Sequence, residues 1–597
     1  MKKIFALALA ALMLAGMLAG CGTATTSQGG SSTTAAATTA AAGTSAAAAT
    51  ATTEPTAPAE PKIFYDWGST RATFSPHNYT SRKIIDVFST LVGIVSTVDG
   101  SDQLTFVPHD TLELPTSSDG GTTWICKLRD DIQFSDGTPI TAETYEYSAK
   151  MLIDPKLANK NAAYMFDPCV VLNAKEYFQG SCEWEAVGFK AKDATTLEIT
   201  LKYPSTEIDF FTNLGALIWP VHPELYEAGM NADRTSTNYG TDITTMAYSG
   251  PFILKEWVLD GYEILVRNEN NPLVKQGFYF LDEVNTRYVT ENATRWQMFE
   301  NNELDWTALS GDYYDANKND PRGVKSISAS VWGIFVNGES KNVIMQDNDF
   351  RLALYHSAPR VSIATEIYRM YDSPNYLIST GISVTGSDGV SKPYRDTPEA
   401  KALVAKYCDD DALALQLFEA AYARNGSKKI TIEMTYFDGQ EEMKRSGEVC
   451  QEKWEGLFGA DRFELTLRAV QPQQAYDNYR VGDYDLGTGV RSGNSFNMWS
   501  SLFVYTSDYS DKYLTGFYNE EFDQLYFDSM YGDLLHDPDA RIKALARMEA
   551  LLMEHCVFIP TMQNNNTWLI NERIELPTYT YLPWVTYGFF QSDIIPG

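Results

Sequence analysis

The chain has 597 residues, of which 44% are hydrophobic and 21% are charged, and its formal net charge at pH 7 is −31. This length is well above what a single hydrophobic core organises, so we expect at least two lobes. The negative charge argues against nucleic acid or an anionic lipid surface as the partner. It does not identify a ligand, because charged surface residues are usually just solvated.

The N-terminal segment has the pattern of a secretory signal. Lys2 and Lys3 precede an apolar run over 4–18, and small residues lead up to Cys21. The run is shorter than the roughly 20 residues that a membrane span needs, so we expect residues 1–20 to be removed as a signal peptide. The stretch before Cys21 resembles the bacterial lipobox. The resemblance implies that Cys21 is lipidated and anchors the chain to the extracytoplasmic face of the cell membrane.

Residues 21–61 are expected to form a disordered tether behind this cysteine. After Cys21 they are almost wholly Ala, Thr, Ser and Gly, with a few Pro and Glu. Such a segment has too few large apolar side chains to offset the entropy of ordering, so it cannot build a core. A flexible tether of this kind suits a binding domain that ranges some distance from a membrane.

Six cysteines follow Cys21, and none forms a Cys-x-x-Cys pair. Metal clusters and thioredoxin-like chemistry are therefore not expected. Cys169 and Cys182 are close enough in sequence to staple a loop in an oxidising compartment, and whether they pair stays open. The remaining four are expected to be buried thiols: Cys126, Cys408, Cys450 and Cys556.

The first part of the body mixes strands and helices. We expect a strand over 63–68, a loop through 74–78 and a helix over about 81–92. Alternating apolar residues predict further strands over 122–128 and 196–201. This mixture is typical of an α/β lobe.

A second helix is expected from Thr141 to about Ile153, with Thr141 as its N-cap. It lies inside a longer motif. Residues 118–155, SDGGTTWICKLRDDIQFSDGTPITAETYEYSAKMLIDP, resemble the signature of the peptide/nickel-type (family 5) extracellular solute-binding proteins of ABC importers, which include oligopeptide-binding lipoproteins. The segments SGPFILKEW (249–257) and GDYD (482–485) resemble later landmarks of that family, in the same order.

The resemblance implies an α/β, two-lobed periplasmic-binding-protein-like fold with hinge strands and an extra subdomain on lobe one. Lobe one would span 62–331, with the subdomain at about 91–214, and lobe two would span 332–560. Residues 561–597 would return to lobe one. Two such lobes can close on a ligand by rotating about a few hinge residues. The expected hinge strands are 332–337 and 557–563.

Three places are candidates for ligand contact. Asn78 and Tyr79 follow the first strand and would face the cleft, unless this loop is an ordinary connection. Trp332 would lie beside the hinge, although a Trp in an apolar strand often belongs to the core. The third place is the polar loop after a strand in lobe two, RSGNSFNMW, with Arg491, Asn494 and Trp499 as the expected contacts.

This loop departs from the family pattern. Peptide-binding members usually follow the strand with a Trp and an Asp-containing stretch whose carboxylate pairs with the peptide's amino terminus. The stretch from Arg491 to Asn494 has no acid, and Asn cannot neutralise a buried ammonium group. Arg491 instead suits a carboxylate or another anion, unless it forms a salt bridge within its own lobe. The aromatic content of 13% would also suit stacking on sugar rings.

Enzyme chemistry is not expected. The sequence has no Gly-x-Ser-x-Gly elbow and no His-Glu-x-x-His zinc helix, and its six histidines are scattered. We therefore expect no catalytic residue, no cofactor and no metal. The predicted function is capture of a small solute, a peptide first of all, and its delivery to ABC permease subunits by a monomer. The alternatives are an oligosaccharide or metal-chelate ligand, a ligand-sensing surface receptor, and an extracytoplasmic hydrolase.

Overall fold

The chain divides into two units, Met1–Ala59 and Glu60–Gly597, and all described residues belong to the second. The predicted signal peptide, Cys21 and most of the tether therefore lie outside the described residues. The computed structural model describes residues 60–79, 86–96, 104–166, 169–491, 499, 502–507, 509, 513–578 and 588–595.

Lobe one is built on a four-stranded sheet in the order β1-β10-β9-β8. The strand β1 pairs in parallel with β10, and the other neighbours are antiparallel. Phe64 on β1 is fully buried and belongs to the core of this lobe. The strands are β1 (Ile63–Gly68), β8 (Phe252–Val258), β9 (Tyr262–Arg267) and β10 (Glu283–Tyr288).

A subdomain within lobe one has its own antiparallel sheet and its own core. Trp124 stacks on Phe210 in this core, with ring centroids 4.2 Å apart. The helix α1 (Ala142–Leu152) buries Tyr145 and Leu152 in the same core. The sheet order is β4-β5-β7-β6, with β4 (Thr116–Ser117), β5 (Thr123–Lys127), β6 (Phe189–Asp193) and β7 (Thr196–Thr200).

The other elements of lobe one lie outside these two sheets, and four of them form the two-stranded sheets β2-β3 and β19-β20. The strands are β2 (Val92–Ser96), β3 (Leu104–Pro108), β19 (Ile574–Glu575) and β20 (Asp593–Ile594). The helices are α2 (Ala174–Phe178), α3 (Glu207–Phe210), α4 (Pro223–Ala228), α5 (Pro272–Lys275), α6 (Asn292–Glu300) and α7 (Gly311–Asn317).

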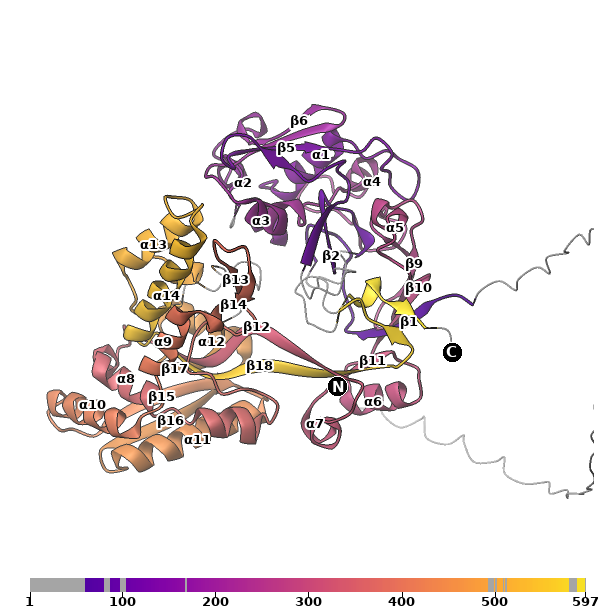
Figure 1. Cartoon of the computed structure of the whole chain (residues 1–597). Coiled ribbons are helices and arrows are strands. Elements are labelled where there is room, and N and C mark those ends of the chain that lie inside the picture. Colours follow the sequence, from indigo (N-terminus) through magenta and orange to yellow (C-terminus); the bar gives the residue numbers. More distant parts are fainter. Residues whose placement is uncertain are drawn as a thin grey trace, which may run out of the picture. The chain divides into compact units, whose positions relative to one another are not determined.

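Lobe two contributes most of a six-stranded sheet in the order β11-β18-β12-β17-β15-β16. Helices pack around this sheet and enclose one large core (Figure 1). The strands of this sheet are β11 (Trp306–Leu309), β12 (Gly323–Val336), β15 (Ile430–Phe437), β16 (Phe463–Val470), β17 (Leu486–Arg491) and β18 (Phe558–Ile570). The helices are α8 (Asn348–His356), α9 (Pro398–Lys406), α10 (Asp411–Arg424), α11 (Glu441–Phe458), α12 (Pro472–Val481), α13 (Glu520–Met530) and α14 (Pro538–Glu554), and a hairpin pairs β13 (Ser383–Thr385) with β14 (Ser391–Pro393).

Two long strands, β12 and β18, each take part in both lobes (Figure 1). On β12, Val324 is buried in the core of lobe one and Val331 in that of lobe two. On β18, Phe558 belongs to the core of lobe two and Ile570 to that of lobe one. The pairing of the two strands shifts register between Ile327 and Val331, just before the first stretch expected as a hinge.

Most of the predicted elements are present. The expected strands over 63–68, 122–128 and 196–201 are observed as β1, β5 and β7. Thr141 caps α1, because its hydroxyl accepts a hydrogen bond from the backbone N–H of Thr144.

The helix expected over 81–92 is wrong at its end, where the strand β2 begins at Val92. Residues 81–85 lie outside the described part of the chain. The error has a tertiary cause, since Val92 pairs with Pro108 of β3 and is fully buried, which favours a strand at this point.

The cysteines after Cys21 are all free in the structure. The Sγ of Cys169 lies 3.4 Å from the backbone oxygen of Asp209, whereas that of Cys182 lies 3.7 Å from the backbone oxygen of Asn173. The two thiols thus have different partners and form no disulfide. Of the four expected buried thiols, three are buried, but the prediction is wrong for Cys408, which is exposed.

Candidate ligand-binding site

Three strands of the large sheet meet at the point where the chain passes between the lobes. Arg491, the last residue of β17, pairs with Val331 on β12, and Val331 pairs on its other side with Gln563 on β18. Trp332 follows Val331 and is half-buried. The sheet therefore places two of the predicted contact residues, Arg491 and Trp332, beside the strands that join the lobes.

The guanidinium group of Arg491 lies among aromatic rings. Its central carbon is 4.3 Å from the ring centroid of Phe335, 4.7 Å from that of Tyr505 and 4.9 Å from that of Tyr513. Its Nε–H donates a 2.8 Å hydrogen bond to the hydroxyl of Tyr505. We call Arg491 with these three rings the arginine cage. Each ring face attracts the cation, but none of them neutralises it.

The arginine cage contains no carboxylate. Arg491 forms no ion pair with any residue that the structure describes. Burial raises the pKa of Tyr505 above its usual value, so this phenol stays protonated and adds no negative charge. The alternative that Arg491 forms a salt bridge within its own lobe is therefore not observed among the described residues.

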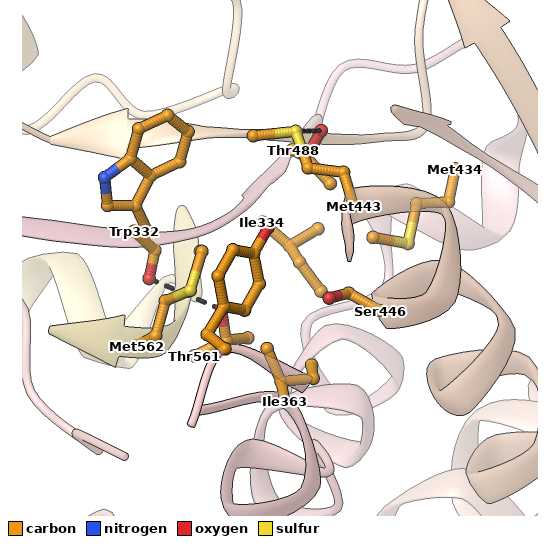
Figure 2. A pocket seen from close by; sticks show the side chains of 11 residues that line it. Trp332, Ile334, Ile363, Met434, Met443, Ser446, Thr488, Thr561 and Met562 are labelled. Atoms are coloured by element: carbon orange, nitrogen blue, oxygen red, sulfur yellow. Dashed lines mark hydrogen bonds between the residues drawn. The ribbon is translucent and has the colours of Figure 1, made fainter. Parts of the chain in front are cut away.

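The opposite face of the sheet carries a small apolar cavity of about 20 Å³ beside Trp332 (Figure 2). This volume holds no more than about one water-sized or methyl-sized group. Its three methionines have flexible side chains that can adapt to different shapes. The lining residues include Trp332, Ile363, Met434, Met443, Thr488 and Met562.

The predicted contacts in lobe one are tied to their own lobe. The amide of Asn78 donates to Asn159 at 2.7 Å and accepts from the backbone N–H of Lys160 at 3.1 Å. The side chain of Tyr79 is buried, its ring packs edge-on against Trp219, and its hydroxyl lies 3.0 Å from that of Tyr164. These contacts hold the loop in place. A role of Asn78 and Tyr79 in ligand binding stays a prediction.

The far end of the loop in lobe two lies in a packed environment. Trp499 is 1% exposed, and the guanidinium carbon of Arg541 on α14 is 5.3 Å from its ring centroid. Arg541 also pairs with Asp209 of the subdomain at 3.3 Å, so this contact joins the two lobes away from β12 and β18. Asn494 lies outside the described residues. Contacts of Trp499 and Asn494 with a ligand stay predictions.

Sequence reasoning missed the three rings of the arginine cage. Phe335 is on β12, whereas Tyr505 and Tyr513 are in the segment after the predicted loop. The chain has 35 tyrosines and 29 phenylalanines, so their type alone singles out none of them. Phe335 lies three residues after Trp332, so in a strand the two side chains lie on opposite faces. The sequence does not show which of these faces Arg491 covers.

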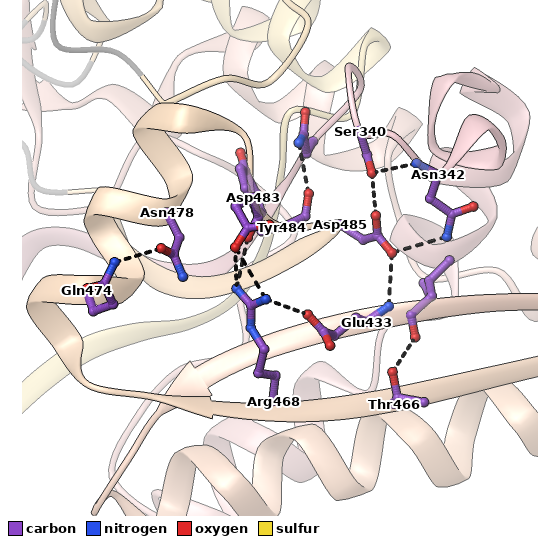
Figure 3. Close-up of polar contacts among 12 residues, drawn as sticks. Ser340, Asn342, Glu433, Thr466, Arg468, Gln474, Asn478, Asp483, Tyr484 and Asp485 are labelled. Atoms are coloured by element: carbon purple, nitrogen blue, oxygen red, sulfur yellow. Dashed lines mark hydrogen bonds and ion pairs between the residues drawn. The ribbon is translucent and has the colours of Figure 1, made fainter.

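A second cavity lies at the other end of β17 and, unlike the first, is lined by polar side chains. It has a volume of about 210 Å³. Figure 3 shows the ion pairs and hydrogen bonds among its polar side chains. Arg468 pairs with Glu433 at 3.2 Å and with Asp483 at 3.4 Å. The carboxylate of Asp485 accepts hydrogen bonds from Ser340, Asn342 and a backbone N–H. Hydrogen bonds therefore satisfy the carboxylate of Asp485, and two acids neutralise Arg468.

Within the described residues, no group of three or more His, Cys, Asp or Glu side chains is arranged to hold a metal ion. The helices of the described part are also all too short or too polar to cross a bilayer. His77, which lies in the candidate loop of lobe one, contacts the hydroxyl of Tyr226 through Nδ1 at 3.0 Å. Burial lowers the pKa of His77 to about 3.

Two lobes joined by a pair of shared strands, with polar and aromatic groups at the junction, define a two-lobed binding protein. Residues 105–513 match the family model described as "Bacterial extracellular solute-binding proteins, family 5 Middle". This match covers more than half of the chain, so the protein belongs to family 5 of the extracellular solute-binding proteins.

Two relatives and one solved structure are similar along most of their length. The probable deoxycholate-binding periplasmic protein YgiS of Escherichia coli is 25% identical over 68% of this chain and 70% of its own. The dipeptide-binding protein DppE of Bacillus subtilis is 23% identical over 76% of this chain and 78% of its own length. The structure of Listeria monocytogenes OppA bound to peptide covers 90% of this chain and 100% of its own, with 22% identity and a TM-score of 0.66. The similarity to the Listeria structure shows that the two proteins share a fold.

Proposed function

We propose that the protein is the lipid-anchored substrate-binding component of an ABC importer, which captures a peptide between its lobes and delivers it to the permease. The observation that carries this proposal is the pair β12 and β18, each of which has one end in the core of each lobe. Because two strands are shared between the lobes in the described part of the chain, a small rotation about them can open and close the space between two rigid bodies.

Peptide as the ligand is supported by the relatives. DppE is named a dipeptide-binding protein, and the Listeria structure contains a bound peptide. YgiS is named a probable deoxycholate-binding protein, so one relative is named for a ligand that is not a peptide. Binding without catalysis agrees with a family of solute-binding proteins, and we expect the bound ligand to be released unchanged.

Native mass spectrometry of the mature chain, without residues 1–20 and with Cys21→Ser, tests the ligand. Purification without refolding keeps a co-purified ligand in place. We expect adducts of variable mass that fragment as peptides. A single sugar, a metal chelate or another small molecule as the adduct would contradict peptide as the ligand and leave the binding function intact.

The membrane anchor has its own test. Full-length protein should fractionate with membranes and carry a lipid on Cys21, whereas Cys21→Ala should release the protein from the membrane. Delivery is tested by uptake of labelled peptide in cells that lack the chromosomal copy. Uptake should return with the wild-type gene, and failure to return despite normal expression and peptide binding would favour a sensing role instead.

A further inference from the structure

An ion pair joins the two lobes at a place away from β12 and β18. Arg541, near the start of α14 in lobe two, lies 3.3 Å from the carboxylate of Asp209 on α3 in the subdomain of lobe one. The two side chains are 12% and 10% exposed, so water screens this pair less than it screens an ordinary surface pair. The pair therefore bears on how readily the lobes separate.

Each partner of this pair is held in place by its own lobe. The carboxylate of Asp209 accepts a 2.7 Å hydrogen bond from the hydroxyl of Thr206, which is the N-cap of α3. The guanidinium carbon of Arg541 lies 5.3 Å from the ring centroid of Trp499, a residue of the core of lobe two. Because both groups are oriented by their own lobes, less conformational entropy is lost when the lobes meet.

An aromatic contact between the lobes lies beside the ion pair. The ring of Tyr203, from the subdomain, has its centroid 4.7 Å from that of Tyr531 and 5.7 Å from that of Phe527, both in lobe two. The cavity between Tyr203, Asp209 and Tyr531 measures about 10 Å³, which leaves room for no more than about one water molecule. We call the ion pair and these three rings the interlobe patch. Its surfaces meet with little water between them.

The arginines of α14 differ in which lobe they contact. Arg547 pairs with Glu521 at 2.7 Å and with Glu554 at 3.4 Å, and both acids belong to lobe two. Six residues of an α-helix turn by about 240°, so Arg541 and Arg547 lie on different faces of α14. The helix thus uses one arginine within its own lobe and presents the other to lobe one.

We propose that Asp209 and Arg541 form a latch that holds the lobes closed and so slows release of the ligand without contacting it. A rotation about β12 and β18 that opens the space between the lobes separates this pair, since its two partners belong to different lobes. The proposal rests on the proposed function, because it needs a ligand that is held between the lobes. It makes the retention time depend on a contact within the protein as well as on the ligand's own contacts.

The first test measures closure of the mature chain after dialysis, with no ligand added. Spin labels are attached at Leu112→Cys in the subdomain and at Val390→Cys in lobe two, because these side chains are 63% and 57% exposed. The background carries Cys21→Ser, Cys182→Ser and Cys408→Ser, so that the remaining native thiols are buried. Double electron–electron resonance then gives the distribution of distances between the two labels.

We expect Asp209→Asn and Arg541→Gln each to lower the ratio of closed to open molecules by about 5- to 10-fold, between the effects of exposed and buried ion pairs. The double variant should lower the ratio no further than either single variant, because the two side chains act as one pair. Arg547→Gln, on the same helix, is the matched control and should keep the wild-type distribution. Circular dichroism confirms that each variant is folded.

The second test measures release of a ligand. A tritium-labelled tetrapeptide pool is bound to the protein and then chased with an excess of the unlabelled pool. Asp209→Asn should release the label about 5- to 10-fold faster than the wild type and bind it at nearly the same rate, since loss of one partner of a buried charge pair acts mainly on dissociation. Tyr203→Ala should act in the same direction, because it removes the aromatic part of the interlobe patch. Unchanged release in both variants would overturn the latch.

The outcomes separate the latch from the proposed function. If Asp209→Asn and Arg541→Gln leave the distance distribution unchanged, or if their effects add in the double variant, the latch is overturned and the proposed function stands. If Arg547→Gln shifts the distribution as much as Arg541→Gln does, the effect belongs to α14 as a whole, and the latch is again overturned. If the distributions shift as expected but no tetrapeptide binds the wild type, the closing role of the pair stands and peptide as the ligand is wrong.

Discussion

Arg395 and Arg491 lie in the same lobe in nearly the same kind of aromatic surroundings, but they differ in charge balance. Arg395 stacks on Tyr376 at 4.5 Å and Tyr394 at 4.6 Å, and pairs with Glu549, which is fully buried. Arg491 stacks on rings just as closely and has no acid in the described part of the protein. The pair of Arg395 with a buried acid ties two segments of lobe two together, whereas Arg491 is held by ring contacts and a single hydrogen bond to Tyr505.

Removing the carboxylate of Glu549, which pairs with Arg395, should have the largest effect on stability. Glu549 accepts hydrogen bonds from the backbone N–H groups of Leu377 and Ile378 and from the hydroxyl of Tyr394, besides its ion pair. Glu549→Ala leaves the charge of Arg395 buried and unpaired. We expect the free energy of unfolding in urea to fall by about 3–5 kcal/mol. A loss below about 1 kcal/mol would contradict a structural role for the pair of Arg395 and Glu549.

The same substitution, arginine to glutamine, compares Arg395 and Arg491 directly. Arg395→Gln leaves Glu549 without its counter-charge, so we expect a loss of several kcal/mol in the free energy of unfolding, on the order of the 3–5 kcal/mol for a broken buried pair. Arg491→Gln removes an unpaired charge, and we expect a change within about 1 kcal/mol. Urea unfolding of both variants in one buffer measures the difference. Equal losses would mean that Arg491 is structural as well.

Arg395 and Arg491 do not titrate in the usual pH range, but buried histidines and a buried carboxyl group of lobe one should contribute to the pH dependence of stability. Burial lowers the pKa values of His77 and His109 to about 3, so the unfolded chain binds more protons at these sites as the pH falls from 6.5 towards 3. Their contribution to stability is fully present above pH 6.5 and is lost on acidification. Burial raises the pKa of Asp110 to about 7, which has the opposite sign: its penalty grows as the pH rises from 3.8 to 7.

Two variants separate these contributions. Between pH 6 and 4, His77→Gln should make the loss of stability on acidification shallower, and Asp110→Asn should make it steeper. Each change should be about 1.4 kcal/mol per pH unit, the value for one proton. Urea unfolding at several pH values measures both slopes. Slopes that shift in the same direction for the two variants would contradict the assigned protonation states.

The smallest effect on stability is expected at the polar cavity beside β17, whose side-chain contacts are drawn in Figure 3. The side chains of Arg468, Glu433 and Asp483 are 30%, 39% and 58% exposed, so solvent screens their attraction. Arg468→Gln should change the free energy of unfolding by no more than about 1 kcal/mol and leave the apparent Kd for a labelled peptide unchanged. A clear loss of binding would assign this cavity a role in ligand capture.

Local sequence patterns determined much of this protein. The strand over 63–68, the helix capped by Thr141 and the family 5 signature over 118–155 all depend on neighbours in the chain, and each was confirmed. The same patterns made Arg491 a candidate, because an arginine in an acid-free polar loop after a strand is visible in the sequence.

Only the tertiary structure decided the rest, since it depends on residues that are far apart in the chain. Val92 is in a strand because β3 pairs with it, and Cys408 is exposed although its sequence surroundings suggested burial. The aromatic environment of Arg491 is the clearest case. Phe335 and Arg491 are brought together by the pairing of β12 with β17, and a long-range strand register of this kind follows from packing and not from local propensity.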